Sequence, residues 1–169
     1  MVAVTIAVII LASVYDTLIF GNTWHNKVFN QADLQEKGQN MLNQIIDGRF
    51  INSVRVGGLR QGRRVTNNGT GIAYVTVTDS VVYKVSYHLN NNSIYYDCQV
   101  ISATDPEATT PTIGGGAPVL ENVTGFEITE INVSGKRTFS ISITVEKNSY
   151  GGGANRAVLT AWARPRNLR

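Results

Sequence analysis

Cysteine and histidine are scarce in this chain of 169 residues, which has a single cysteine, Cys98, and two histidines, His25 and His88. A lone cysteine cannot form a disulfide within the chain, and no C-x-x-C pair or other metal-ligand spacing occurs. Cys98 lies in an apolar run, so we expect it to pack as a small buried hydrophobe rather than act as a nucleophile. The sequence therefore argues against a disulfide-stapled scaffold and against a zinc site.

Charged residues and catalytic motifs are also few. Asp, Glu, Lys and Arg make up 16% of the chain, below the roughly 25% of an average soluble domain. No G-x-S-x-G, H-E-x-x-H or Walker A motif occurs, so we expect neither an enzyme nor a cofactor. Asp105 and Glu107 come closest to calcium ligands, but they lack the spacing of an EF-hand, and we expect no metal.

The N-terminal segment is almost continuously apolar. Residues 2–14 read VAVTIAVIILASV, and apolar residues return after Asp16 and Thr17. A surface helix of a soluble protein shows only an apolar stripe, and a membrane-spanning helix needs about 20 apolar residues. We therefore expect residues 1–20 to form a stem in a membrane or a filament core, with its first residues upstream of Met1. The expected stem contacts are Val2, Ala3, Val4, Ile6, Ala7, Val8, Ile9, Ile10, Leu11, Ala12 and Val14.

Asp16 is the one acidic residue in this stem. A charged side chain is costly inside hydrocarbon. Two interpretations stay open: Asp16 marks the place where the helix leaves the membrane, or it contacts a neighbouring subunit.

Residues 21–48 continue the same helix in amphipathic form. Their apolar positions mostly follow one helical stripe, and Gly38 fills a gap in it. Gly48, after Asp47, suits the left-handed conformation that ends helices. One helix of about 45 residues, roughly 65–70 Å long, is therefore predicted. Its expected contacts with the rest of the chain are Trp24, Val28, Leu34, Met41, Leu42, Ile45 and Ile46.

Residues 49–169 show the period-two alternation of antiparallel strands and predict a β-rich head. Strands are expected from Val54, then over residues 73–77, 81–89 and 94–100, with Val100 and Cys98 facing inward. A loop is expected over 103–118, followed by strands over 119–123, 126–133, 139–145 and 157–163. The amphipathic half of the helix should cover one face of the sheet. The predicted fold is α+β, a long N-terminal helix packed on an antiparallel β-sheet head.

Four segments, in order, carry a resemblance. Residues 2–18 read VAVTIAVIILASVYDTL, residues 81–97 read VVYKVSYHLNNNSIYYD, residues 119–128 read VLENVTGFEI, and the chain ends RAVLTAWARPRNLR. The first is similar to the N-terminal helix of type IV pilins and pseudopilins. The other three resemble strands of W-type minor pilins and of J-type minor pseudopilins of type II secretion. Arg166 and Asn167 match their terminal strand, and Asp97 stands where those proteins often have arginine.

The resemblance implies a structural role. Such subunits wait in the inner membrane as single-pass proteins with the head outside the cytoplasm, and are then assembled into a type IV pilus or a secretion pseudopilus. Their partners are other pilin or pseudopilin subunits, through the stem, together with the inner-membrane assembly platform and membrane lipid. Minor subunits typically lie at the tip and initiate assembly. The family's basic leader and N-terminal glutamate are expected upstream of Met1.

Two other functions remain open. A DNA-capturing pilin of a competence system would use basic residues to neutralise phosphates; their simpler interpretation is solvated turns and a tail. A membrane-anchored ligand-binding β domain would use a tyrosine-rich hairpin. The candidate nucleic-acid contacts are Arg55, Arg60, Arg63 and Arg64, and the hairpin tyrosines are Tyr83, Tyr87, Tyr95 and Tyr96.

Overall fold

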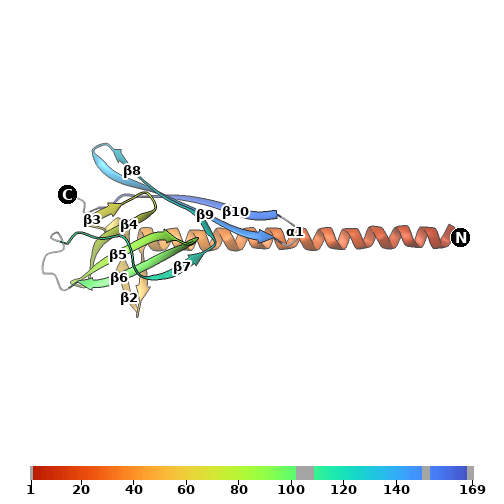
Figure 1. The fold of residues 1–169 in the computed structure, drawn as a ribbon, viewed down its shortest axis with the longest axis horizontal. Helices are drawn as coiled ribbons and strands as arrows, with labels where there is room; N and C mark the ends of the chain where they lie inside the picture. Colours follow the sequence, from red (N-terminus) through yellow and green to blue (C-terminus); the bar gives the residue numbers. More distant parts are fainter. Residues whose placement is uncertain (1, 102–108, 150–152, 167–169) are drawn as a thin grey trace.

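A single helix, α1, sets the long axis of the molecule. The computed structural model describes residues 2–101, 109–149 and 153–166, and α1 occupies Val2–Asp47, a length of 46 residues. Figure 1 shows the first half of α1 projecting freely, while all strands gather around its second half. The predicted α+β fold, a long N-terminal helix on an antiparallel β head, is confirmed.

Gly48 ends the helix and begins the head in one step. Its φ is +102°, a conformation that side chains with a Cβ rarely adopt. The chain reverses there into the hairpin of β1 (Gly48–Ile51) and β2 (Val54–Gly57). Asn52 and Ser53 form its two-residue turn with φ of 46° and 69°, as the right-handed twist of a hairpin favours. The sequence predicted a strand from Val54 and missed the partner strand β1.

Five strands form the larger antiparallel sheet, in the order β3-β4-β5-β6-β7. A short 3-10 helix, η1 (Leu59–Gln61), leads into it. Sequential neighbours pair throughout, and β7 begins at Ala117, inside the expected loop. The strands are β3 (Arg64–Asn67), β4 (Gly71–Thr78), β5 (Val81–Asn90), β6 (Ser93–Ile101) and β7 (Ala117–Glu121).

Three strands form the second antiparallel sheet, in the order β10-β9-β8. They are β8 (Val123–Val133), β9 (Lys136–Ser149) and β10 (Gly153–Ala163). Asn122 links β7 to β8 with a φ of 61°, so the chain passes between the two sheets through a single residue. The last strand starts four residues before the predicted one, which extends this sheet along α1 toward the stem.

The core lies where the second half of α1 meets both sheets. Leu42 and Ile45 of the helix, Ile72 of β4 and Ile141 of β9 have no exposed surface. Val100 was expected to face inward, but 68% of its surface is exposed. The reason is that β7 pairs only with residues 93–96 of β6, so the far end of β6 extends beyond the core.

Three tyrosines of this core should ionise only when the head unfolds. Burial raises the pKa of Tyr74, Tyr87 and Tyr96 above the ordinary value of 10.0. The folded state therefore keeps protons that the unfolded chain loses near that value, so this stabilisation is complete below pH 10 and is lost as the pH rises further. Phenolate absorbance and circular dichroism measured together should show these groups titrating with the loss of β structure. Their ionisation in a head with intact β structure would contradict the prediction.

Candidate assembly surface on the stem

The stem helix carries an uncovered apolar surface. Every side chain from residue 4 to residue 29 is exposed, and the large apolar ones range from 48% exposed at Val28 to 72% at Phe20. The predicted stem residues Val4, Ile6, Ala7, Val8, Ile9, Ile10, Leu11, Ala12 and Val14 all lie on this surface, whereas the side chains of Val2 and Ala3 lie outside the described residues. Apolar patches of this extent are rare on soluble monomers.

Two hydroxyl groups of the stem are bonded to carbonyls of the helix itself. Ser13 Oγ donates to the Ile9 carbonyl at 2.8 Å, and Thr17 Oγ1 donates to the Ser13 carbonyl at 2.7 Å. Such bonds satisfy polar groups that water cannot reach in hydrocarbon. An 18-residue window of this helix has a mean hydropathy of 2.1, so it is long and apolar enough to cross a membrane.

A hydrogen bond from Gln31 joins the helix to the head. Its Nε2 donates to the Arg156 carbonyl of β10 at 3.1 Å. From there the apolar stripe is covered, and Gly38 allows close approach, because a Cβ added there would lie 2.5 Å from Leu159 Cδ1. The buried helix residues are Leu34, Met41, Leu42, Ile45 and Ile46, none more than 5% exposed.

Trp24 and Val28 were wrongly assigned to this contact. They are 61% and 48% exposed. Eighteen residues make five helical turns, so Trp24 and Val28 have the same angular position as Leu42 and Ile46. The stripe is thus continuous, but the head leaves the part of it before residue 30 exposed.

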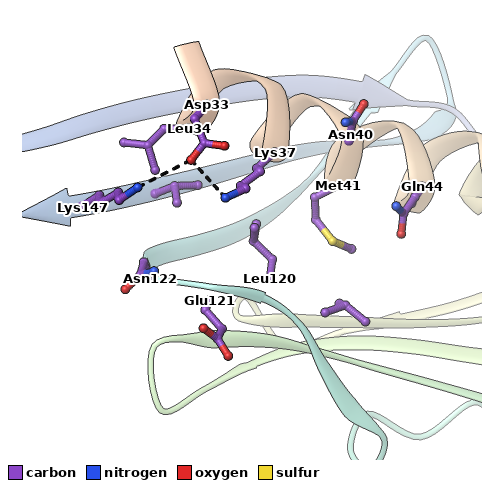
Figure 2. A pocket seen from close by; sticks show the side chains of 12 residues that line it. Asp33, Leu34, Lys37, Asn40, Met41, Gln44, Leu120, Glu121, Asn122 and Lys147 are labelled. Carbon is purple, nitrogen blue, oxygen red and sulfur yellow. Dashed lines mark hydrogen bonds and ion pairs between the residues drawn. The ribbon is translucent and has the colours of Figure 1, made fainter. Parts of the chain in front are cut away.

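A groove of about 360 Å³ lies at the helix–head junction. Figure 2 shows Asp33 of α1 between two lysines. Its Oδ2 is 3.0 Å from Lys37 Nζ and 3.8 Å from Lys147 Nζ of β9. Glu121 lies across the groove from the helix. The lining residues include no Ser, Thr, Tyr, Cys or His, and the charged side chains among them are Asp33, Lys37, Glu121 and Lys147.

Sequence reasoning missed Asp33 and Lys147. The i to i+4 spacing of Asp33 and Lys37 was a readable signal. The pairing with Lys147 was not, because it depends on the register of β9 against the helix. Both pairs are partly exposed to water, and such pairs contribute about 0–1 kcal/mol each. Only the Asp33–Lys147 pair joins the helix to the head, and a pair of this strength cannot by itself hold the head there.

The basic residues of the predicted nucleic-acid contact have separate environments. Arg60 Nη1 lies 2.8 Å from Asp47 Oδ1, and Arg55 donates to the Asp47 carbonyl. Arg63 and Arg64 precede and open β3, and no side-chain partner is recorded for either among the described residues. The C-terminal segment joins this region, since the Arg166 N–H donates to the Arg60 carbonyl at 2.9 Å.

The remaining candidates are Cys98 and the acidic residues Asp105 and Glu107. Cys98 is half-buried, and burial raises the pKa of its thiol, which disfavours the reactive thiolate. Asp105 and Glu107 lie outside the described residues. Within the described part of the chain, no three His, Cys, Asp or Glu side chains gather as a metal site would need.

The tyrosine-rich hairpin offers no open aromatic platform. Tyr87 is 1% exposed and packs on Tyr96 with ring centroids 4.9 Å apart. Tyr83 and Tyr95 are also partly buried. Tyr87 therefore belongs to the core, and the other three rings lie at its margin.

Comparison with protein-family models, curated proteins and solved structures finds no match to this chain.

Two leucine substitutions in α1 test whether the helix has one half that stabilises the head and one half that does not. Leu42→Ala removes a side chain with no exposed surface, so the free energy of unfolding of the head should fall by about 2–5 kcal/mol. Leu18→Ala is the matched control, because Leu18 is 66% exposed. Chemical denaturation of the full chain in detergent measures both. Equal destabilisation by the two variants would show that the head does not depend on the covered stripe.

Proposed function

We propose that this chain is a structural subunit of the pilin-like class, a minor pilin or pseudopilin that is held in a membrane by its stem and assembled into a filament. The exposed apolar surface over residues 4–29 carries the proposal. Lipid tails and neighbouring apolar helices are similar environments, so such a helix can exchange one for the other at little cost.

The architecture of the head supports the proposal. The head packs against the second half of α1, which leaves the first half free to contact lipid or other stems. The segments that resemble W-type and J-type minor subunits lie on the hairpin of β5 and β6, on β7 and β8, and on β10. These segments therefore form strands of the two sheets. A fold shared with such subunits would keep these strands in the same order along the chain.

In this proposal the head lies outside the cytoplasm. The stem anchors the subunit in the inner membrane before assembly, and the assembly platform then moves it into a pilus or a type II secretion pseudopilus. A position at the tip is part of the proposal because the resemblance is to minor subunits. The proposed activity is mechanical, and its partners are other stems.

A charge placed in the stem tests membrane insertion. Leu11→Arg should oppose insertion by roughly 2.5–3.5 kcal/mol and shift the full chain out of the membrane fraction. Val100→Arg is the control, because Val100 is exposed on the head, away from the stem. Fractionation of cells that express each variant measures the effect. A wild-type chain that stays soluble and monomeric without detergent would overturn the proposal.

A second candidate, DNA capture, is favoured by one observation. The bond between Arg166 N–H and the Arg60 carbonyl brings Arg166 to η1, which precedes β3. Two basic segments about a hundred residues apart in the sequence therefore meet at one end of the head. A pilus component with such an end would hold DNA by phosphate contacts.

The salt dependence of DNA binding tests this candidate. Arg64→Ala should reduce the slope of log affinity against log salt by about 1, because one phosphate contact is lost. Arg137→Ala is the control, since Arg137 is already paired with Glu130. Fluorescence anisotropy with duplex DNA measures both slopes. If the wild-type chain does not bind DNA, or binds it with an affinity that does not depend on salt, DNA capture is excluded.

A further inference from the structure

The exposed part of α1 carries one acidic and one basic side chain. Between residues 2 and 29 the formally charged residues are Asp16 and Lys27. Both are exposed, and no interaction of either side chain is recorded among the described residues. Asp16 also interrupts an apolar surface, where an unpaired carboxylate is expensive.

Helix geometry prevents the two groups from pairing within one molecule. They are separated by 11 residues, about three turns, so they share one face but lie about 16.5 Å apart along the axis. The described part of the head covers neither charge, because every side chain from residue 4 to residue 29 is exposed. Among the described residues of this chain, neither charge therefore has a partner.

The same helical face permits a close neighbour. Ala12 and Thr23 lie within about 40° of Asp16 around the helix axis. Both have small side chains, and Thr23 Oγ1 is already bonded to the Ile19 carbonyl at 2.8 Å. Two helices can approach closely where small residues face each other.

We propose that Asp16 of one copy forms an ion pair with Lys27 of a second copy that is displaced along the helix axis by about 16.5 Å. Copies at the same depth in a membrane cannot form this pair. When one copy is raised by three turns relative to its neighbour, its Asp16 lies level with Lys27 of the lower copy. Lys27 of the raised copy is then free to pair with Asp16 of a further copy. The contact is heterologous and open-ended, the geometry that generates filaments rather than closed dimers.

This inference rests on the proposed function and adds a register to it. The pair would fix how far each subunit rises relative to the one below. Its opposite charges favour the staggered arrangement over the in-register one, in which Asp16 would face Asp16. Removal from water at the stem contact would strengthen the pair beyond that of an exposed one.

Disulfide cross-linking tests the stagger with both charges intact. Ala12 and Thr23 are also 11 residues apart on this face, so a stagger of three turns places residue 12 of one copy beside residue 23 of the next. The full chain, in a Cys98→Ser background, is prepared as Ala12→Cys and Thr23→Cys variants, which are mixed and oxidised as the detergent is diluted away. The expected product is the mixed 12–23 dimer. Predominant 12–12 dimers would overturn the register.

Charge exchange tests the pair itself. Asp16→Lys and Lys27→Asp should each reduce the yield of 12–23 dimer on the order of tenfold, and the double variant should restore it. Asn22→Lys is the matched control, because residue 22 faces about 120° away from Asp16, and its yield should be unchanged. A yield insensitive to all these changes would overturn the pair.

The failure of this inference is distinguishable from that of the proposed function. A chain that inserts in membranes and self-associates, but only in register or without regard to charge, refutes the inference alone. A chain that neither inserts nor self-associates refutes both.

Discussion

The burial of one helical stripe between two sheets organises the rest of the molecule. Leu42 and Ile45 have no exposed surface, and they join a single core with residues of β4 and β9. Each sheet has an apolar inner face that would meet water without the helix, and β-sheets of few strands are marginal without such cover. The fold of the head therefore depends on the second half of α1, while the side chains of residues 4–29 are all exposed.

Sequence patterns predicted which helices and strands form better than they predicted where the contacts between them end. The all-apolar start, the amphipathic continuation and the Gly48 stop defined α1, because local chemistry determines all three. The sequence did not show where the head ends along the helix. Trp24 and Leu42 occupy equivalent positions on the same stripe, and only the tertiary reach of β10 covers one and leaves the other bare. Val100 was misjudged for the same reason, since alternation says nothing about whether a neighbouring strand extends far enough.

The candidate site is the exposed surface of one helix. Its residues are contiguous in the sequence, so they could be predicted without knowledge of the fold. An exposed apolar helix is defined by composition alone, so its residues were visible in the sequence. Contacts between distant segments were not. The Asp33–Lys147 pair and the Arg166–Arg60 bond join residues that no local pattern connects.

Because β1 begins at Gly48, directly after α1 ends at Asp47, the stem and the head are rigidly connected. No proline interrupts α1, and proline is a common cause of sharp helix kinks. The head is held along the helix from Gln31 to its end and has no linker in which to swivel. Any rotation of the stem about its axis must therefore turn the whole head through the same angle. In the proposed filament, the angular position of the stem would therefore decide which side of the head faces outward.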